Sequence, residues 1–159
     1  MLMRTVEGEI VVNAGIDDVW KAWTTKEGVK SFFAPDCNIE LKIGGAYEML
    51  FDLEAEQGSR GGEGMKFLAI QSNKLLSFTW NAPPHIPDVR KQLTHVTVLF
   101  EKISQKQTKI SLAHDGWGEG PDWDEAFKYF EIAWLKIVLP RLKYRFDVSP
   151  IDWNNIPKL

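Results

Sequence analysis

The sequence has a single cysteine, Cys37, among its 159 residues. A lone cysteine excludes a disulfide within the chain and most cysteine-based metal sites, and a reducing cytoplasm is then the simplest expected location. No apolar run approaches the roughly 18 residues of a membrane span, so we expect none. The N-terminal stretch MLMRTVEGEIVV has acidic residues and a strand pattern, whereas a signal peptide has a basic start and an apolar block; we expect no signal peptide.

The sequence also lacks an excess of positive charge. Nineteen basic residues stand against 22 acidic ones, the net charge is −3, and lysine and arginine form no dense stripe. Contact with nucleic-acid phosphates needs such a stripe, so no nucleic-acid partner is expected. The three histidines lack the spacing typical of metal ligands, and the glycine-rich stretch 58–64 does not lead into the GK[ST] sequence of a phosphate loop. We therefore expect neither a metal nor another cofactor, and interpret 58–64 as a loop that could cover a cavity.

Aromatic residues, in contrast, are abundant. The chain contains seven tryptophans, nine phenylalanines and three tyrosines. With 44% hydrophobic and 26% charged residues, a chain of this length is expected to form one domain, residues 1–159, with a sizeable core. No repeat or break in composition indicates a second domain.

The longest periodic segment runs from Pro121 to Phe146. Pro121 suits the first turn of a helix because its missing N–H would be unpaired there. Acidic residues follow it and basic residues gather at the other end, as the helix dipole favours. Pro140 should kink this helix or end its regular part. One face carries apolar residues at helical spacing: Trp123, Phe127, Phe130, Trp134, Ile137 and Val138.

The residues before this helix are expected to form mostly strands. An alternating pattern predicts a first strand at 3–12, followed by two short helices, one at 16–23 and one ending near residue 33. Further strands are predicted at 38–42, 47–53, 64–71, 76–80, 96–101 and 110–115. Both faces of 64–71 are apolar, so its inward face is left open. Short turns between strands give an antiparallel sheet whose apolar face covers the long helix, an α+β arrangement.

Six short stretches carry a resemblance to a known family: Val19-Trp20-Lys21-Ala22-Trp23, Phe32-Phe33-Ala34-Pro35, Ile43-Gly44-Gly45, Leu76-Ser77-Phe78-Thr79-Trp80, Thr97-Val98-Leu99-Phe100-Glu101 and Leu112-Ala113-His114-Asp115-Gly116-Trp117. In order and spacing they resemble the START-like superfamily, also labelled SRPBCC, in the branch named after the activator of heat-shock-protein-90 ATPase. The resemblance implies a helix-grip fold: a curved antiparallel sheet of about seven strands around a long C-terminal helix, with two short helices after the first strand. It covers about residues 4–146 and leaves 147–159 as a C-terminal tail.

A cavity between sheet and helix follows from the same resemblance, and a filled core is the alternative for every residue assigned to it. Helix phase and strand parity give the residues expected to line it: Met49, Phe51, Phe78, Trp80, Val98, Phe100, Leu112, His114, Phe127, Phe130, Trp134 and Arg141.

Two members of this set are polar. Parity with Leu112 points His114 inward, where it could orient a ligand, act as an acid or base, or simply be a hydrogen-bonded histidine at a strand end. Arg141 continues the aromatic helix face and could pair with a ligand carboxylate or phosphate. The alternatives are a salt bridge to an acidic loop residue or plain solvation.

Three functions remain open at this point. The first is binding of an apolar or aromatic small molecule in the cavity, without catalysis. The second is a cyclase- or aromatase-type enzyme that uses His114 with cavity hydroxyls or Arg141, and the third is a co-chaperone-like interaction module. A homodimer is a further alternative for the assembly.

Overall fold

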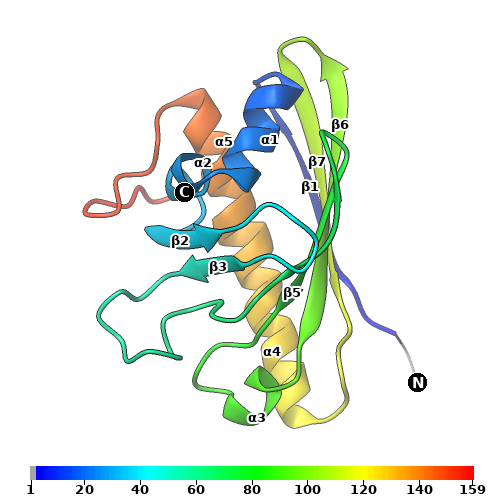
Figure 1. Ribbon diagram of the computed structural model, residues 1–159, viewed down its shortest axis with the longest axis vertical. Helices are drawn as coiled ribbons and strands as arrows, with labels where there is room; N and C mark the ends of the chain where they lie inside the picture. Colours follow the sequence, from blue (N-terminus) through cyan, green and yellow to red (C-terminus); the bar gives the residue numbers. More distant parts are fainter. Residues whose placement is uncertain (1–2) are drawn as a thin grey trace.

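An antiparallel sheet of five strands lies along one side of a long C-terminal helix in the computed structural model, which describes residues 3–159 (Figure 1). Residues 1 and 2 lie outside the described residues. They begin both the predicted domain and the N-terminal stretch in which no signal peptide is expected. The strand order is β1-β7-β6-β5-β4, so the first strand pairs with the last. The bounds are β1 (Val6–Val12), β4 (Phe67–Gln71), β5 (Leu75–Trp80), β6 (Thr94–Ser104) and β7 (Gln107–Asp115).

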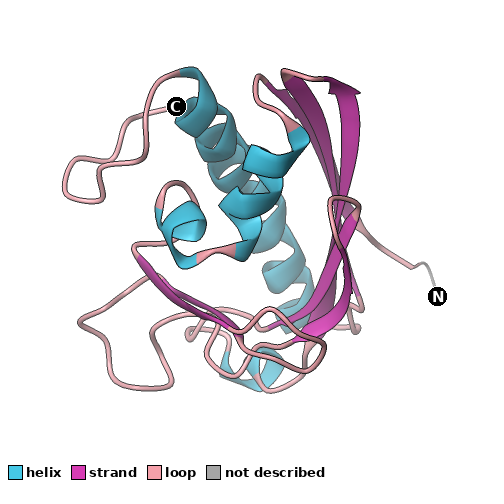
Figure 2. Ribbon diagram, turned by 45° about the horizontal axis from the view of Figure 1, so that its top comes forward, coloured by secondary structure: helices cyan, strands magenta, loops and turns pink. Residues whose placement is uncertain are grey.

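Two further strands form a second, smaller sheet. β2 (Asp36–Ile39) and β3 (Tyr47–Leu50) pair with each other, and isolated bridges from Ala46 to Lys66 and from Leu50 to Gly61 connect β3 to the segment that leads into β4. The described residues thus contain the expected seven strands, but the sheet is divided. Figure 2 shows the helices enclosed by strands on two sides.

The two short helices after β1 are confirmed as α1 (Ile16–Thr24) and α2 (Lys26–Lys30). The hydroxyl of Thr25 accepts a hydrogen bond from the Gly28 N–H at 3.0 Å and so caps α2. α2 ends three residues before the predicted boundary, and the following turn carries Phe32 and Phe33, both almost fully buried.

The long helix consists of three consecutive parts. α4 (Pro121–Ile132) begins with Pro121 in its first turn, a π-helix η1 (Ala133–Val138) follows, and α5 (Leu139–Asp147) ends the helix. The regular α-helix does not end at Pro140 as predicted: it is interrupted earlier by a change in helix type and resumes through Pro140 in α5.

The inward faces of the strands follow the predicted alternation. Buried side chains include Leu76, Phe78 and Trp80 of β5, Val96, Val98 and Phe100 of β6, and Ile110, Leu112 and His114 of β7. The unassigned strand turns Met65 and Phe67 inward and leaves Leu68 46% exposed, with a register irregularity after Phe67. An α+β helix-grip arrangement is therefore present, with its core between the five-stranded sheet and the helices.

Three local predictions need correction. The strand predicted at 47–53 ends at Leu50, and Leu53 is 48% exposed because the chain bends away there into a loop. The strand predicted at 38–42 lies at 36–39. A short helix that was not predicted, α3 (Pro87–Arg90), follows β5 in a stretch too short and too rich in proline to show a helical period.

The C-terminal tail packs against α2. Ile151 is 5% exposed, and its N–H donates to the carbonyl of Ser31 at 2.8 Å. The indole N–H of Trp153 donates to the carbonyl of Lys30 at 2.6 Å. Within residues 3–159, none of the helices combines the length and the apolar character needed to cross a membrane.

Candidate functional site

A pocket of about 230 Å³ opens beside the long helix, where the helix faces three aromatic side chains from the rest of the chain. We call it the aromatic pocket. Phe33 comes from the turn after α2, Phe51 from the bend after β3, and Trp80 from the last position of β5. The helix supplies the other wall: Tyr129, Phe130, Ala133, Trp134, Ile137, Val138 and Arg141.

The rings of the pocket are in mutual contact. The Trp80 and Trp134 rings lie 5.6 Å apart, and Phe33 lies 5.7 Å from Trp134 and 5.9 Å from Trp80. Phe51 extends this group, with its ring 6.2 Å from that of Phe33. Phe51 remains 44% exposed, so it stands at the opening, whereas Trp134 is 1% exposed at the base.

The π-helix forms most of the helical wall. Leu139 donates its N–H to the carbonyl of Trp134, five residues earlier, where an α-helix would bond four residues earlier. Pro140 provides the reason: it has no N–H, and its ring collides with the carbonyl four residues before it in an α-helix. Widening the preceding turns relieves that collision. π-helical turns are often found at functional sites, because they change the direction of side chains.

His114 lies in a chain of hydrogen bonds beneath the pocket. The indole N–H of Trp134 donates to His114 Nδ1 at 3.0 Å, so Nε2 carries the proton and faces the Thr94 hydroxyl at 2.6 Å. That hydroxyl donates to the carbonyl of Trp80 at 3.2 Å. Burial, with a smaller contribution from His95, lowers the His114 pKa from 6.5 to about 3. The imidazole is therefore neutral and joins helix to sheet.

The far end of the pocket is cationic. Arg141 lines it, and the guanidinium carbon lies 5.5 Å from the centre of the Trp153 ring. The hydrogen bond from Trp153 to Lys30 and the buried Ile151 fix the tail that brings this ring into place. The tail thus supports Arg141, although none of its residues lines the pocket.

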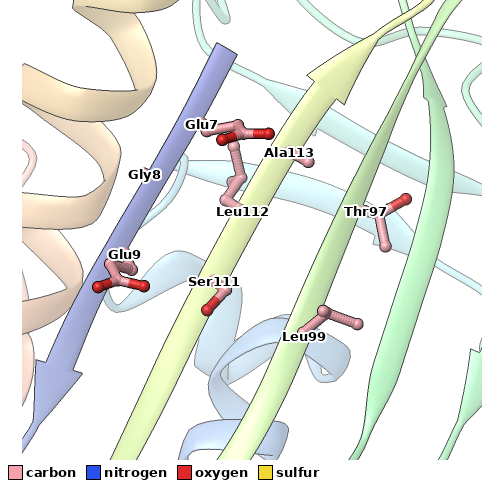
Figure 3. Close-up of a pocket in the computed structure, with 8 residues that line it drawn as sticks. All are labelled: Glu7, Gly8, Glu9, Thr97, Leu99, Ser111, Leu112 and Ala113. Carbon is pink, nitrogen blue, oxygen red and sulfur yellow. The ribbon is translucent and has the colours of Figure 1, made fainter. Parts of the chain in front are cut away.

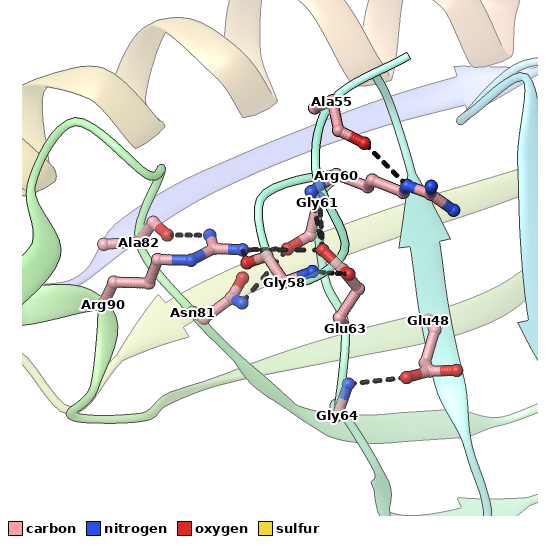
Figure 4. Close-up of polar contacts among 10 residues, drawn as sticks. All are labelled: Glu48, Ala55, Gly58, Arg60, Gly61, Glu63, Gly64, Asn81, Ala82 and Arg90. Atoms are coloured by element: carbon pink, nitrogen blue, oxygen red, sulfur yellow. Dashed lines mark hydrogen bonds and ion pairs between the residues drawn. The ribbon is translucent and has the colours of Figure 1, made fainter. Parts of the chain in front are cut away.

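A glycine-rich loop, residues 52–64, begins directly after Phe51. The Glu63 carboxylate accepts hydrogen bonds from the backbone N–H groups of Gly58, Arg60 and Gly61 (Figure 4). Burial alone would raise the Glu63 pKa, but these N–H groups and the nearby Arg90 hold it below its usual value. One side chain therefore organises the loop.

Arg90 fastens this loop to α3. Its guanidinium donates to the carbonyls of Ala82 at 2.5 Å and of Gly58 and Gly61 at 2.8 Å each, and lies 3.8 Å from Glu63 (Figure 4). The loop predicted to cover a cavity is thus tied down at Gly58 and Gly61, and none of its residues lines the aromatic pocket.

Larger grooves elsewhere differ in chemistry. One of about 400 Å³ lies on the outer face of the five-stranded sheet, and among the described residues it is lined by Glu7 and Glu9 and by aliphatic and hydroxyl side chains, without a ring (Figure 3). Another, of about 620 Å³, lies between α1, α2 and α5 and carries charges of both signs, such as Asp18 and Lys26. The aromatic pocket differs from both grooves, because it combines ring walls with a single charged end.

The predicted cavity residues divide into three groups. Phe51, Trp80, Phe130, Trp134 and Arg141 line the aromatic pocket. A second group belongs to the filled core and does not reach the pocket: Met49, Phe78, Val98, Phe100, Leu112 and His114.

The core group is covered by other rings. Phe100, for example, packs against Trp20 with ring centres 4.9 Å apart, and Phe78 against Tyr47 at 4.6 Å. Phe127 forms the third group by itself, because it packs on Trp117 at 5.3 Å and under the Arg4 guanidinium, outside the pocket.

Sequence reasoning missed several pocket residues. Phe33 belongs to one of the stretches that carried the family resemblance, but no periodicity orients a turn residue. Ile137 and Val138 were assigned to the aromatic helix face without being assigned to the cavity. Ala133 lines the pocket where the helix changes from α to π, and Tyr129 lines it from α4, which contacts α3.

No catalytic metal cluster is evident in residues 3–159, where three or more His, Cys, Asp or Glu side chains nowhere gather as metal ligands would. Cys37 is buried, and burial, followed by the charge of Asp36, raises its pKa to about 11. The thiol is therefore unreactive in the folded protein.

The chain matches a known protein family in sequence. A model of the family described as "Activator of Hsp90 ATPase homolog 1-like protein" matches residues 13–143. None of the curated proteins matches the chain.

Among solved structures, a protein from Mesorhizobium loti superimposes with a TM-score of 0.71 at 20% identity, covering 93% of this chain and 100% of the other. The Aha1 dimer from Colwellia psychrerythraea gives 0.69 at 20% identity, covering 92% of this chain and 98% of the other. An HSP90 activator from Plasmodium falciparum gives 0.66 at 16% identity, covering 94% and 98%. At these identities the structures share the fold.

Proposed function

Because this chain belongs to the family of activator of Hsp90 ATPase homolog 1-like proteins and carries an aromatic pocket beside its long helix, we propose that it binds a small apolar or aromatic molecule in that pocket. The observation that carries the proposal is the set of rings from Phe33, Trp80 and Trp134, which line a space that their side chains leave unfilled. Largely apolar concave sites with few polar groups are typical of small-molecule binding.

The size of the pocket limits the ligand. At about 230 Å³ it lies below the range of pockets for drug-sized molecules, so one or two fused rings are expected. Burying about 150 Å² of apolar ligand surface contributes about 4 kcal/mol, which alone gives a dissociation constant near millimolar. Tighter binding requires an additional polar contact.

A thermal-shift titration with 2-naphthamide tests the proposal. At tenfold over its Kd a ligand that binds only the native state stabilises it by about 1.4 kcal/mol, which raises the Tm of a domain of this size by about 3–6 °C. Quenching of tryptophan fluorescence should accompany the shift, because Trp80 and Trp134 form the walls.

A matched pair of variants locates the binding. Ala133→Phe fills the pocket and should abolish the shift, whereas Ile132→Phe adds the same ring one residue earlier, where the side chain is 57% exposed, and should leave it unchanged. The proposal fails if small aromatic probes give no response, or if Ala133→Phe binds them as the wild type does.

The enzyme alternative finds less support in the geometry. His114, its only internal acid or base candidate, has both ring nitrogens in hydrogen bonds, is fully buried and does not line the pocket. A general acid or base must reach the proton that it transfers. Turnover would therefore require other residues.

The co-chaperone-like alternative and the homodimer both need a contact surface. The outer face of the five-stranded sheet offers one, since Val11, Leu99 and Ile103 are 39%, 47% and 50% exposed there. A neighbour of this fold is an Aha1 dimer and another an HSP90 activator. Light scattering after size exclusion tests the dimer, and the ATPase rate of Hsp90 with and without the protein tests the co-chaperone role. We also propose that the protein is cytoplasmic and that residues 1–159 form a single domain.

A further inference from the structure

The charged end of the aromatic pocket specifies the ligand further. Arg141 presents a planar guanidinium with five N–H donors. Among residues 3–159 it takes part in no ion pair and donates no hydrogen bond within the usual distance limits, and its one specific partner is the Trp153 ring at 5.5 Å. A partly buried guanidinium in this state has unused capacity for an acceptor.

A comparison with Arg90 makes the difference clear. Burial lowers the pKa of both arginines, but the Glu63 carboxylate compensates at Arg90, whereas burial acts alone at Arg141. Arg90 also has three carbonyl acceptors. Arg90 is therefore a structural arginine with its partners in place, and Arg141 lacks the corresponding anion.

The C-terminal tail places the Trp153 ring against Arg141. Trp153 is held by its hydrogen bond to Lys30 at 2.6 Å, and the tail is anchored by the buried Ile151. The guanidinium carbon lies over the face of the Trp153 ring, a cation–π contact that uses none of the N–H donors in a hydrogen bond. Such an arrangement orients the side chain before any ligand arrives.

No carboxylate lines the pocket in the part of the chain that the structure describes, so its only formal charge is positive. An anion would be attracted, and a carboxylate matches the fork of a guanidinium by two parallel hydrogen bonds. The ring walls and the small volume restrict the rest of the molecule to one or two flat rings.

We propose that the ligand is a small aromatic carboxylate, whose ring lies against the pocket wall that includes Trp80 and Trp134 and whose carboxylate pairs with Arg141, with Trp153 as the positioning residue. This inference rests on the proposed binding function and deepens it. It also supplies the polar contact that apolar area alone does not provide.

Two probes of equal shape separate the charge from the ring: 2-naphthoate and its neutral amide, 2-naphthamide, titrated by calorimetry. The wild type should bind the carboxylate about 10- to 100-fold more tightly, because hydrogen bonds between charged groups contribute that much. Arg141→Gln should remove most of this preference, with a much smaller effect on the amide than on the carboxylate, and circular dichroism shows whether the variant is folded.

Two further variants sharpen the test. Arg145→Gln removes an arginine one turn later that lines a different groove, and it should leave both affinities unchanged. Trp153→Leu should weaken the carboxylate several-fold with the amide unaffected, whereas a merely structural role for the tail would weaken both probes equally.

The outcomes are distinct. If both probes bind the wild type equally, or if Arg141→Gln keeps the preference, the charge inference is overturned while the binding function stands. If neither probe binds the wild type, the proposed function fails and the inference fails with it.

Discussion

Replacing His114 by glutamine should change how the stability of the protein depends on pH. In the native protein the ring is neutral, because its nitrogens bond Trp134 and Thr94 and burial lowers its pKa from 6.5 to about 3. In the unfolded chain the imidazole titrates near 6.5. The unfolded state therefore binds the proton more readily, and the stability linked to this group is complete above pH 6.5 and is lost as the pH falls from there toward about 3.

The magnitude follows from the two pKa values. At about pH 5 the unfolded state is favoured by about 2 kcal/mol through this group alone, and at about pH 7.5 by almost nothing. The glutamine variant lacks this titration. It also leaves the Trp134 N–H without its acceptor, which should cost about 1–3 kcal/mol at both pH values. The variant is thus less stable at neutral pH, but the gap to the wild type should shrink by about 2 kcal/mol on acidification.

Urea unfolding followed by tryptophan fluorescence measures this gap at the two pH values, with linear extrapolation of each free energy of unfolding. His85→Gln is the control, since His85 is a loop residue with a side chain 60% exposed. That variant should follow the wild type at both pH values.

A gap between wild type and His114→Gln that stays constant within about 0.5 kcal/mol would refute this reasoning. It would mean that His114 takes up a proton equally in both states, and that the hydrogen-bond chain from Trp134 to Trp80 does not keep the ring neutral.

Three further predictions concern the wall, the loop and the core. Phe130→Ala should cost about 3 kcal/mol in urea unfolding, the lower part of the usual range, because the ring packs on His114 at 4.8 Å but also borders the open pocket; a cost below about 1 kcal/mol would contradict its place in the wall. Glu63→Gln should speed tryptic cleavage after Arg60 without a comparable loss of global stability, whereas Glu56→Gln in the same loop should not; equal cleavage rates would show that the loop does not depend on Glu63. Cys37 should react with a thiol reagent only in urea, because it is fully buried with a pKa of about 11; rapid labelling of the native protein would contradict its placement.

The sequence indicates the fold well, because the fold depends on patterns that a single chain displays. The helical spacing of Trp123, Phe130 and Trp134 and the alternation in β5, β6 and β7 give the right inward faces. The inward direction of His114 was predicted from the same alternation and is confirmed by its full burial.

The pocket itself is less accessible to such reasoning. Whether an inward residue meets another ring or an empty space depends on contacts between distant segments, as for Phe100 against Trp20. Phe33 reaches the pocket from a turn, which has no period. The partner of Arg141 is Trp153, in a tail without any pattern. None of these placements leaves a local signal in the sequence.

The π-helix before Pro140 has a consequence for how this protein can diversify. A π-helical segment corresponds to an α-helix that accommodates one additional residue, and losing it rotates everything on its C-terminal side by about 100° relative to α4. Ile137, Val138 and Arg141 would then point elsewhere while Phe130 stayed in place. A one-residue deletion in this segment would thus reshape the aromatic pocket in one evolutionary step, without a substitution of any wall residue.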